Sequence, residues 1–289
     1  MSNIPLTFVL PLHGASELVR RNMLHEAAAN DAKNMVLQSY HVEEIIADPA
    51  MAEVFRKEMA DEGLTFLDSH APYGEEVDLN MPDTHKIAVL RHKLHLNIAA
   101  GMNVDTMTIH IGNDHTCVGD SCDVQIDRIC CMLDELLPEA EKCGVVICIE
   151  NICLPVNTPE NLWRIKKRFD SPYLGFCYDS GHANNMNNGR FVHGTARDLW
   201  GKCNAGEPLW DDKILEKMMP EMICCHLHDN IGSLDLHNLP GTGNIDWDHT
   251  VKMLKQAPKL RSIQSEIIST RHRISIKKQI DCFRNLFKD

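Results

Sequence analysis

Six residues of metal-ligand type each end a short run that is predicted to form a β-strand. The runs read LTFLDSH, TMTIH, VVICIE, LGFCYD, MICCH and SIQSE. Their last residues are His70, His110, Glu150, Asp179, His226 and Glu266. Imidazole and carboxylate groups are common ligands of divalent cations. The pattern therefore predicts a metal site, provided that the strand ends meet in space.

The spacing of these residues indicates that the strand ends do meet. His70, His110 and Glu150 follow one another at intervals of forty residues, and the same interval separates His226 from Glu266. Such an interval fits one strand–helix unit, and strands that alternate with helices pair in parallel through right-handed crossovers. In a parallel barrel all strands end on one face, so the six residues would form one cluster there.

Strand-like and helix-like segments alternate through the chain, which predicts eight β/α units. Strands are expected at 7–10, 35–38, 64–68, 106–110, 145–150, 174–179, 222–228 and 262–267. Helices are expected at about 17–31, 48–62, 83–100, 123–143, from 159 onward, and at 275–287, with Thr158 as the cap of the helix that starts at Pro159. Eight units predict an α/β fold of the (β/α)8 TIM barrel type, with a doubly wound open sheet as the alternative. No interior linker is evident, so residues 1–289 are expected to form a single domain.

Composition favours a globular enzyme over a nucleic-acid-binding or membrane protein. The formal net charge of -12 argues against a nucleic-acid surface, because phosphate binding depends on patches of Lys and Arg. The 12 Cys include no CxxC pair, so we expect reduced thiols and a cytoplasmic location. The start MSNIPLTFVLPLHG has no basic leader, and no apolar run approaches the roughly 18 residues of a membrane span. We therefore expect neither a signal peptide nor a membrane segment.

Residues in the loops add to the candidate site. In the run YDSGH at 178–182, the glycine allows a sharp turn that would return His182 to the cavity, with a histidine at a helix start as the alternative. His228 would face the same side of its strand as His226. Asp235 and His237 form a D-x-H pair that is typical of chelation on a loop. The glycines of the following GTG run would allow the backbone to approach a ligand closely.

These motifs resemble those of the xylose isomerase-like TIM-barrel superfamily, which includes sugar isomerases and epimerases, inosose dehydratases and endonuclease IV. The matching pieces are HAPY at 70–73, IH at 109–110, IEN at 149–151, YDSGH at 178–182, HLHD at 226–229, DLH at 235–237, LPGTGNI at 239–245 and SE at 265–266. They span nearly the whole chain in the family's order. The resemblance implies a single-domain barrel enzyme of carbohydrate metabolism.

The sugar isomerase/epimerase branch implies one divalent ion held by Glu150, Asp179, His226 and Glu266. The cofactor would be Mn²⁺, Mg²⁺, Zn²⁺ or Co²⁺, because a mixed carboxylate and imidazole set does not choose among them. The two glutamates would exchange protons with a small-molecule carbohydrate, polyol or sugar derivative next to its carbonyl. His182 would orient or protonate a substrate oxygen.

Other residues refine the expected substrate and assembly. Tyr73 and Asn151 are the expected substrate contacts. No clear phosphate clamp is evident; Arg190 is the one candidate, with a solvated loop side chain as the alternative. Residues 227–236 contain no Arg, which argues against the ketose 3-epimerases, since these carry an Arg at that place. By analogy with related barrels, a homo-oligomer is also expected.

Two alternatives remain open. The first is a phosphodiesterase similar to endonuclease IV, which acts on abasic DNA with three zinc ions. Its ligands are the same four residues plus those that match His70, His110, His182, Asp235 and His237, all present here. The net charge of -12 and the run NICLP after Glu150 favour the sugar enzyme. The second alternative is a sugar-binding barrel without catalytic activity.

Overall fold

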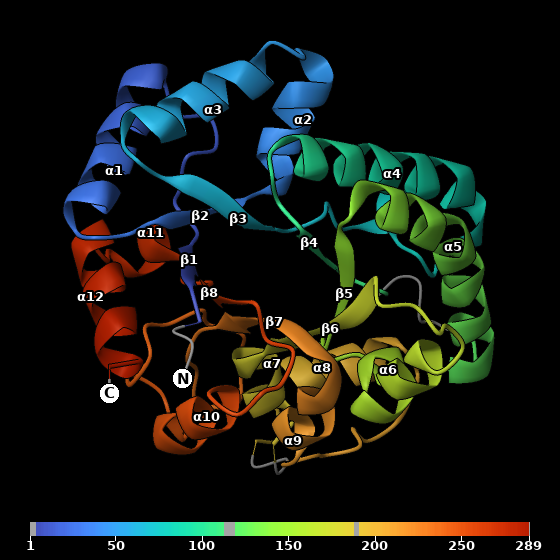
Figure 1. The fold of residues 1–289 in the computed structure, drawn as a ribbon. Helices are drawn as coiled ribbons and strands as arrows, with labels where there is room; N and C mark the ends of the chain where they lie inside the picture. Colours follow the sequence, from blue (N-terminus) through green and yellow to red (C-terminus); the bar gives the residue numbers. More distant parts are fainter. Residues whose placement is uncertain (1–3, 113–118, 188–190, 289) are drawn as a thin grey trace.

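The computed structural model describes residues 4–112, 119–187 and 191–288 and has eight parallel strands at its centre (Figure 1). The strands are β1 (Leu6–Phe8), β2 (Asn34–Leu37), β3 (Thr65–Ser69), β4 (Thr106–Ile109), β5 (Val146–Glu150), β6 (Leu174–Asp179), β7 (Met222–Leu227) and β8 (Ser262–Ser265). They pair in the order β3-β2-β1-β8-β7-β6-β5-β4. The fold is a (β/α)8 TIM barrel, which confirms the prediction from the alternating segments.

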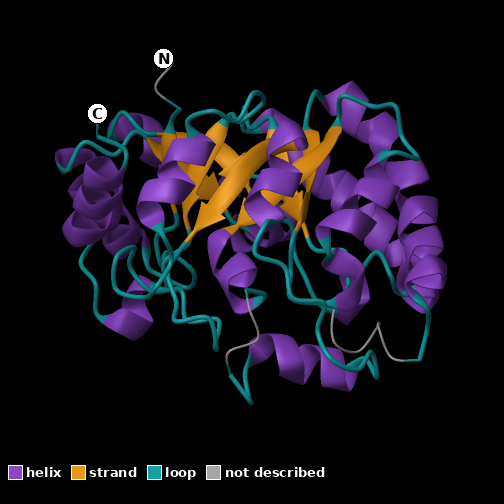
Figure 2. Ribbon diagram, turned by 90° about the horizontal axis from the view of Figure 1, so that it is seen from below, coloured by secondary structure: helices purple, strands orange, loops and turns teal. Residues whose placement is uncertain are grey.

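Twelve α-helices of the described residues surround these strands (Figure 2). They are α1 (Glu17–Ala29), α2 (Ser39–Ala47), α3 (Met51–Asp61), α4 (His85–Gly101), α5 (Cys122–Cys143), α6 (Pro159–Lys166), α7 (Ser180–Asn185), α8 (Thr195–Lys202), α9 (Ile214–Met218), α10 (Trp247–Leu254), α11 (Ser269–His272) and α12 (Ile276–Leu286). Short 3-10 helices lie at Glu75–Val77, Pro82–Thr84, Pro155–Asn157 and Met219–Glu221. Within the described part of the chain, every helix is too short or too polar to span a bilayer.

The barrel closes at a residue of the predicted metal site. A single bridge between His70 and Thr108 joins β3 to β4, where the backbone N–H of Ala71 donates to the Thr108 carbonyl at 2.9 Å. The Ser69 hydroxyl also donates to the Thr106 carbonyl at 2.7 Å. His70 is therefore fixed by the same contacts that complete the barrel.

Alternation along the strands separates an outer apolar layer from the barrel interior. Ile147 and Ile149 belong to the large core that the strands share with the helices. Val146 and Cys148, at the intervening positions, belong to a separate small cluster with Cys177 and other residues of neighbouring strands. Successive side chains of a strand point to opposite faces, so Glu150 continues the inner series of Val146 and Cys148.

The clearest end signals in the sequence appear in the structure. The Thr158 hydroxyl accepts a hydrogen bond from the Asn161 N–H and caps α6, with Pro159 as its first residue. Gly144 ends α5 with a φ of 70°, a left-handed conformation that glycine adopts without steric cost. These caps set where the chain turns from a helix into the next strand.

Short helices account for most differences from the expected elements. The segment expected as one helix at 48–62 begins as α3 at Met51, and α2 precedes it directly after β2. The connection after β6 contains α7, α8 and α9, and α10 lies between β7 and β8. Apart from α3, these helices have nine residues or fewer, too few turns for a clear helical repeat of apolar residues.

The eleven cysteines among the described residues are all free thiols. Seven of them are buried, including Cys148, Cys177 and Cys224 in the barrel strands. This agrees with the expectation of reduced thiols. The cytoplasmic location stays a prediction.

A buried histidine on α4 predicts how stability depends on pH. His95 has no exposed surface, and neither of its ring nitrogens has a hydrogen-bond partner. Burial, together with the neighbouring His92, lowers the pKa of His95 from 6.5 to about 3. The unfolded chain therefore takes up this proton first as the pH falls below 6.5. Because His95 stays neutral in the folded protein, the free energy of unfolding falls as the pH decreases from 6.5 toward the folded pKa of about 3.

The substitution His95→Leu removes this proton uptake. Between about pH 7.5 and pH 5.5, its free energy of unfolding should fall by about 1.4 kcal/mol less than that of the unsubstituted protein. Urea unfolding at the two pH values measures both losses. Equal losses in the two proteins would contradict the assignment of a neutral His95.

Candidate metal centre

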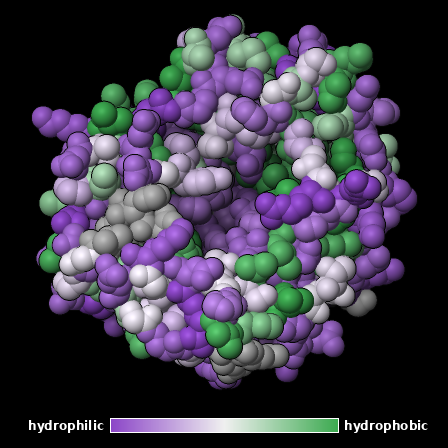
Figure 3. Space-filling view, turned by 180° about the vertical axis from the view of Figure 1, so that it is seen from behind, coloured by the Kyte–Doolittle hydropathy of each residue, from purple (hydrophilic) through white to green (hydrophobic). Residues whose placement is uncertain are grey.

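The strand-end residues converge at the carboxyl end of the barrel, as their spacing predicts. The space-filling view shows a hollow near the middle of one face, with hydrophilic side chains inside it (Figure 3). Four of the residues have ligand atoms that all lie within 4.8 Å of one another: Glu150, Asp179, His226 and Glu266. The ligand atoms of His70 and His110 meet the same condition with Glu150.

Glu150 lies at the centre of this group. Its side chain is 1% exposed, and its Oε2 lies 3.2 Å from His110 Nε2 and 3.8 Å from His70 Nε2. Its Oε1 lies 3.3 Å from His182 Nδ1 and 3.6 Å from His226 Nδ1. Burial raises the pKa of Glu150, but the facing His226 and His110 outweigh burial and bring it well below the ordinary value. The carboxylate is thus held ionised inside the barrel.

The turn after β6 returns His182 to the site. Asp179 Oδ1 accepts a hydrogen bond from the His182 backbone N–H at 2.6 Å and so caps α7. The His182 ring then lies between two carboxylates, with its Nδ1 3.3 Å from Glu150 and its Nε2 3.4 Å from Asp235. Burial lowers the pKa of His182, whereas Asp179 and Asp235 raise it, and the result is well above the ordinary value. His182 therefore lies in the first turn of α7 and also belongs to the site.

Asn151 has a positional role, and its predicted contact with substrate stays a prediction. Its side chain is 2% exposed, and its Nδ2 donates to the Asp179 carbonyl at 3.0 Å. Its Oδ1 accepts from the Asp179 backbone N–H at 2.7 Å. Because these two bonds use both ends of the amide, Asn151 fixes the backbone of Asp179.

The loop after β7 adds a second group of potential metal ligands. One of its members, His228, was not among the predicted ligands. Ligand atoms of His228, Asp235 and His237 lie within 4.8 Å of one another, and the two imidazole rings stack at 3.9 Å. His228 Nε2 is 3.1 Å from Asp179 Oδ2, which joins this group to the first one. A Cβ at Gly181 would lie 1.9 Å from His228 Cε1, so the close approach of this ring requires glycine. The signal in the sequence was the shared strand face with His226.

Several buried polar atoms of the site have no hydrogen-bond partner. They are Glu150 Oε2, His182 Nδ1, both ring nitrogens of His226, His228 Nδ1 and Asp235 Oδ1. A buried donor or acceptor without a partner costs about 1–3 kcal/mol. A divalent ion among these atoms would supply the missing interactions, and the carboxylate and imidazole donors suit Mn²⁺, Mg²⁺, Zn²⁺ or Co²⁺. The residues therefore fit the implied metal.

The glycines of the GTG run donate their backbone N–H groups to a buried carboxylate, and their close approach to a ligand stays a prediction. Asp229 Oδ2 accepts hydrogen bonds from Gly241 N at 2.8 Å, Gly243 N at 3.0 Å and Trp247 Nε1 at 2.9 Å. A Cβ at Gly243 would lie 2.1 Å from the Asn230 carbonyl oxygen. The motif thus ties the loop after β7 to the barrel, which holds Asp235 and His237 in place.

The entrance to the site is an open cavity of about 290 Å³. Glu266, His70 and His237 reach its wall, and Tyr73 lies at its rim with 70% of its surface exposed. The Tyr73 ring stacks on His110 with their centroids 5.1 Å apart, and its contact with substrate stays a prediction. Arg190, the candidate for a phosphate clamp, lies outside the described residues.

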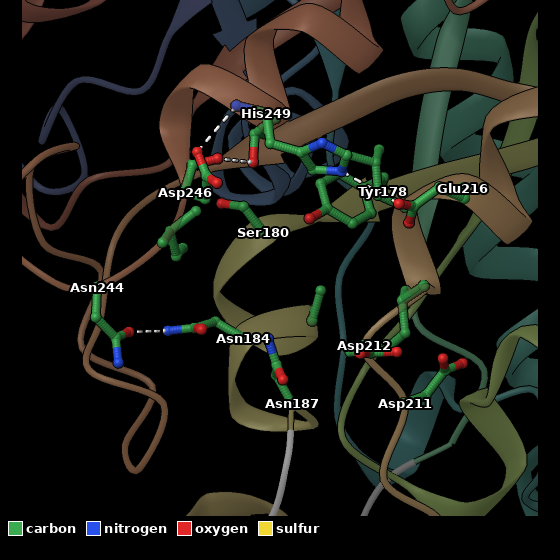
Figure 4. A pocket seen from close by; sticks show the side chains of 15 residues that line it. Tyr178, Ser180, Asn184, Asn187, Asp211, Asp212, Glu216, Asn244, Asp246 and His249 are labelled. Atoms are coloured by element: carbon green, nitrogen blue, oxygen red, sulfur yellow. Dashed lines mark hydrogen bonds and ion pairs between the residues drawn. The ribbon is translucent and has the colours of Figure 1, made fainter.

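A second pocket of about 240 Å³ lies between α7, α9 and α10 (Figure 4). Its polar groups largely bond to one another: the Asn184 amide donates to Asn244 Oδ1 at 2.7 Å, and His249 Nε2 lies 3.1 Å from Glu216. None of the nine predicted ligands is among its described lining residues. The chemistry expected from the sequence therefore belongs to the barrel mouth.

Solved structures with the same fold include several sugar epimerases. A D-tagatose 3-epimerase-like protein is 21% identical over 90% of each chain, with a TM-score of 0.69. A D-psicose 3-epimerase is 11% identical over 98% of this chain and all of its own, with a TM-score of 0.71. The IOLI protein, solved with a bound zinc atom, is 16% identical over 98% of both chains, with a TM-score of 0.70. At these identities the likeness shows the fold.

Two curated relatives match part of the chain. Protein y4fM of Sinorhizobium fredii is 23% identical over 63% of this chain and 55% of its own length, and protein MJ1311 of Methanocaldococcus jannaschii is 27% identical over 65% and 59%. The chain thus spans less than two thirds of either relative. The family model of the xylose isomerase-like TIM barrel matches residues 32–285, and the protein therefore belongs to this family.

Proposed function

We propose that the protein is a divalent-metal-dependent isomerase or epimerase that acts on a sugar, polyol or sugar derivative. The observation that carries the proposal is the group of Glu150, Asp179, His226 and Glu266, whose ligand atoms lie within 4.8 Å of one another. Unpartnered atoms of Glu150 and His226 in this group support a bound cation. Epimerases of tagatose, psicose and ribulose among the similar structures support the substrate class.

These four residues would hold the ion, and the chain's own groups would move the protons. When bound, the ion supplies Lewis-acid stabilisation of the negative charge that develops on the substrate oxygens. Glu150 and Glu266 both lie near His226, whose Nδ1 is 3.6 Å from one carboxylate and 3.4 Å from the other. One glutamate would remove the proton next to the carbonyl, and the other would return a proton from the other side or at the neighbouring carbon.

The pKa values of the two glutamates shift in opposite directions. The pKa of Glu150 is held well below its ordinary value, chiefly because His226 and His110 offset the effect of burial. Burial raises the pKa of Glu266, with His226 and His237 only partly opposing it. Both shifts describe the chain without the ion, which would favour the ionised form of both carboxylates. We therefore propose Glu150 as the base from its central position in the site, with Glu266 as its partner and His182 placed to orient a substrate oxygen.

A specific observation also supports the alternative of a multi-zinc phosphodiesterase acting on abasic DNA. His70 and His110 form one further group with Glu150, and Asp235 and His237 form another with His228. Such groups could hold further ions. The net charge of -12 disfavours nucleic acid, and the number of bound metal ions separates the two functions.

The substitution Glu150→Gln tests the role of the base. It keeps the shape of the side chain but removes its ability to accept a proton, so exchange of the substrate proton should fall by about 10³-fold or more. The measurement is deuterium incorporation from D₂O next to the carbonyl of a panel of free ketoses and aldoses, followed by NMR, with circular dichroism to check the fold. Glu141→Gln, on the exposed surface of α5, is the matched control and should keep full activity. Activity that survives Glu150→Gln would refute the assignment.

Metal analysis tests the choice between the two functions. The purified protein should contain about one divalent ion per chain, and a chelator should abolish proton exchange until the ion is restored. In His110→Ala the ion count should stay the same, because His110 does not belong to the central four. About three ions per chain, with cleavage of abasic DNA that weakens as salt increases, would replace the proposed function with the alternative.

A further inference from the structure

Three buried cysteines face the barrel interior on strands that carry proposed metal ligands. Cys148, Cys177 and Cys224 lie on β5, β6 and β7, each two residues before a residue of the central four. All three are fully buried. Residues two positions apart on a strand face the same side, so these thiols point into the interior beneath Glu150, Asp179 and His226. The barrel interior next to the proposed metal ligands therefore contains three sulfur atoms.

Cys177 is the one of these that reaches the ligands. It pairs in register with Glu150 of β5 on one side and with Cys224 of β7 on the other. Its Sγ and ligand atoms of Glu150 and His226 all lie within 4.8 Å of one another. Both of those residues belong to the central four, so one ion could contact oxygen, nitrogen and sulfur donors together.

A second and independent observation points to a ligand at this place. His226 has no exposed surface, and neither of its ring nitrogens has a hydrogen-bond partner. Glu150, at 1% exposure, has an Oε2 that also makes no hydrogen bond, although His110 Nε2 lies 3.2 Å from it. Fully buried polar atoms are almost always paired, so these atoms indicate an ion that completes their interactions.

The other two thiols have different surroundings. Cys148 Sγ lies 3.7 Å from the Val146 carbonyl oxygen of its own strand. Cys224 Sγ lies 3.4 Å from Thr108 Oγ1 across the barrel. Among the described residues, Cys177 alone of the three belongs to a group of potential metal ligands. Cys148 is therefore a control for Cys177: it is also a fully buried thiol of the barrel interior, but it pairs with Gly175, two residues deeper in the barrel, and lies outside the ligand group.

We propose that Cys177 is a further ligand of the metal centre and makes it selective for borderline ions such as Zn²⁺ or Co²⁺ over Mg²⁺ and Mn²⁺. The inference rests on the proposed metal site and adds to it the class of metal. As the bond between sulfur and the ion forms, the S–H bond breaks and the proton leaves to solvent. Thiolate favours zinc-type ions, whereas carboxylate and water favour magnesium and manganese.

Cobalt substitution tests the proposal by spectroscopy, without an activity assay. The protein stripped of metal is titrated with Co²⁺ as the unsubstituted chain, as Cys177→Ser and as Cys148→Ser. The unsubstituted chain and Cys148→Ser should show a sulfur-to-cobalt charge-transfer band beside the visible bands of bound Co²⁺. Cys177→Ser should keep the visible bands and lose the charge-transfer band. Its affinity for Zn²⁺ should fall by about tenfold or more, and its affinity for Mn²⁺ by much less.

Each other outcome has a defined meaning. Visible bands without charge transfer in the unsubstituted chain would overturn the role of Cys177 and leave the metal site intact. No binding of Co²⁺ at all would overturn the site itself and with it the proposed function. If Cys177→Ser does not fold, cobalt X-ray absorption of the unsubstituted protein decides, since a sulfur neighbour at about 2.3 Å supports the proposal and a shell of only oxygen and nitrogen rejects it.

Discussion

The ionised carboxylate of Glu150, held inside the barrel at 1% exposure, is the constraint on which the rest of the site depends. A carboxylate in such a place is costly unless positive charge surrounds it. Four imidazole rings approach it to within 3.8 Å, from β3, β4 and β7 and from the start of α7. The parallel barrel brings these elements to one point. Burial lowers the pKa of His70 to about 3 and keeps that ring neutral, whereas the pKa values of His182 and His226 are raised, so these two rings or a bound cation balance the buried charge.

Much of the chain around the cluster serves to hold it in place. Asn151 fixes the backbone of Asp179, and Asp179 in turn caps the helix that carries His182. Asp229 gathers the N–H groups of the loop after β7. These contacts are between buried groups and leave few alternative positions for the side chains. A proton transfer between two carboxylates needs this order, because small displacements of a reacting group cost large factors in rate.

The sequence was informative where the physics is local or periodic. Alternation of strands and helices predicted the barrel, and the last residue of each apolar run predicted the cluster around Glu150. What it did not predict depends on contacts between distant segments. Asn151 follows Glu150 in the sequence, and only the pairing of β5 with β6 shows that its amide bonds to the backbone of Asp179. The hydrogen bonds from the GTG run to Asp229 likewise depend on contacts that the sequence does not show.

His228 and Cys177 show a different limit of the sequence. Each lies two positions from a strand-end ligand, so the period of a strand places it on the inner face. Period alone does not say whether an inner residue fills space or meets a ligand. His228 meets Asp179 at 3.1 Å because Gly181 leaves room for its ring, and Cys177 meets Glu150 because the register of β5 and β6 sets them side by side. The depth of a residue along the barrel axis, which register and bulges decide, thus separates the ligand layer from the packing layer below it.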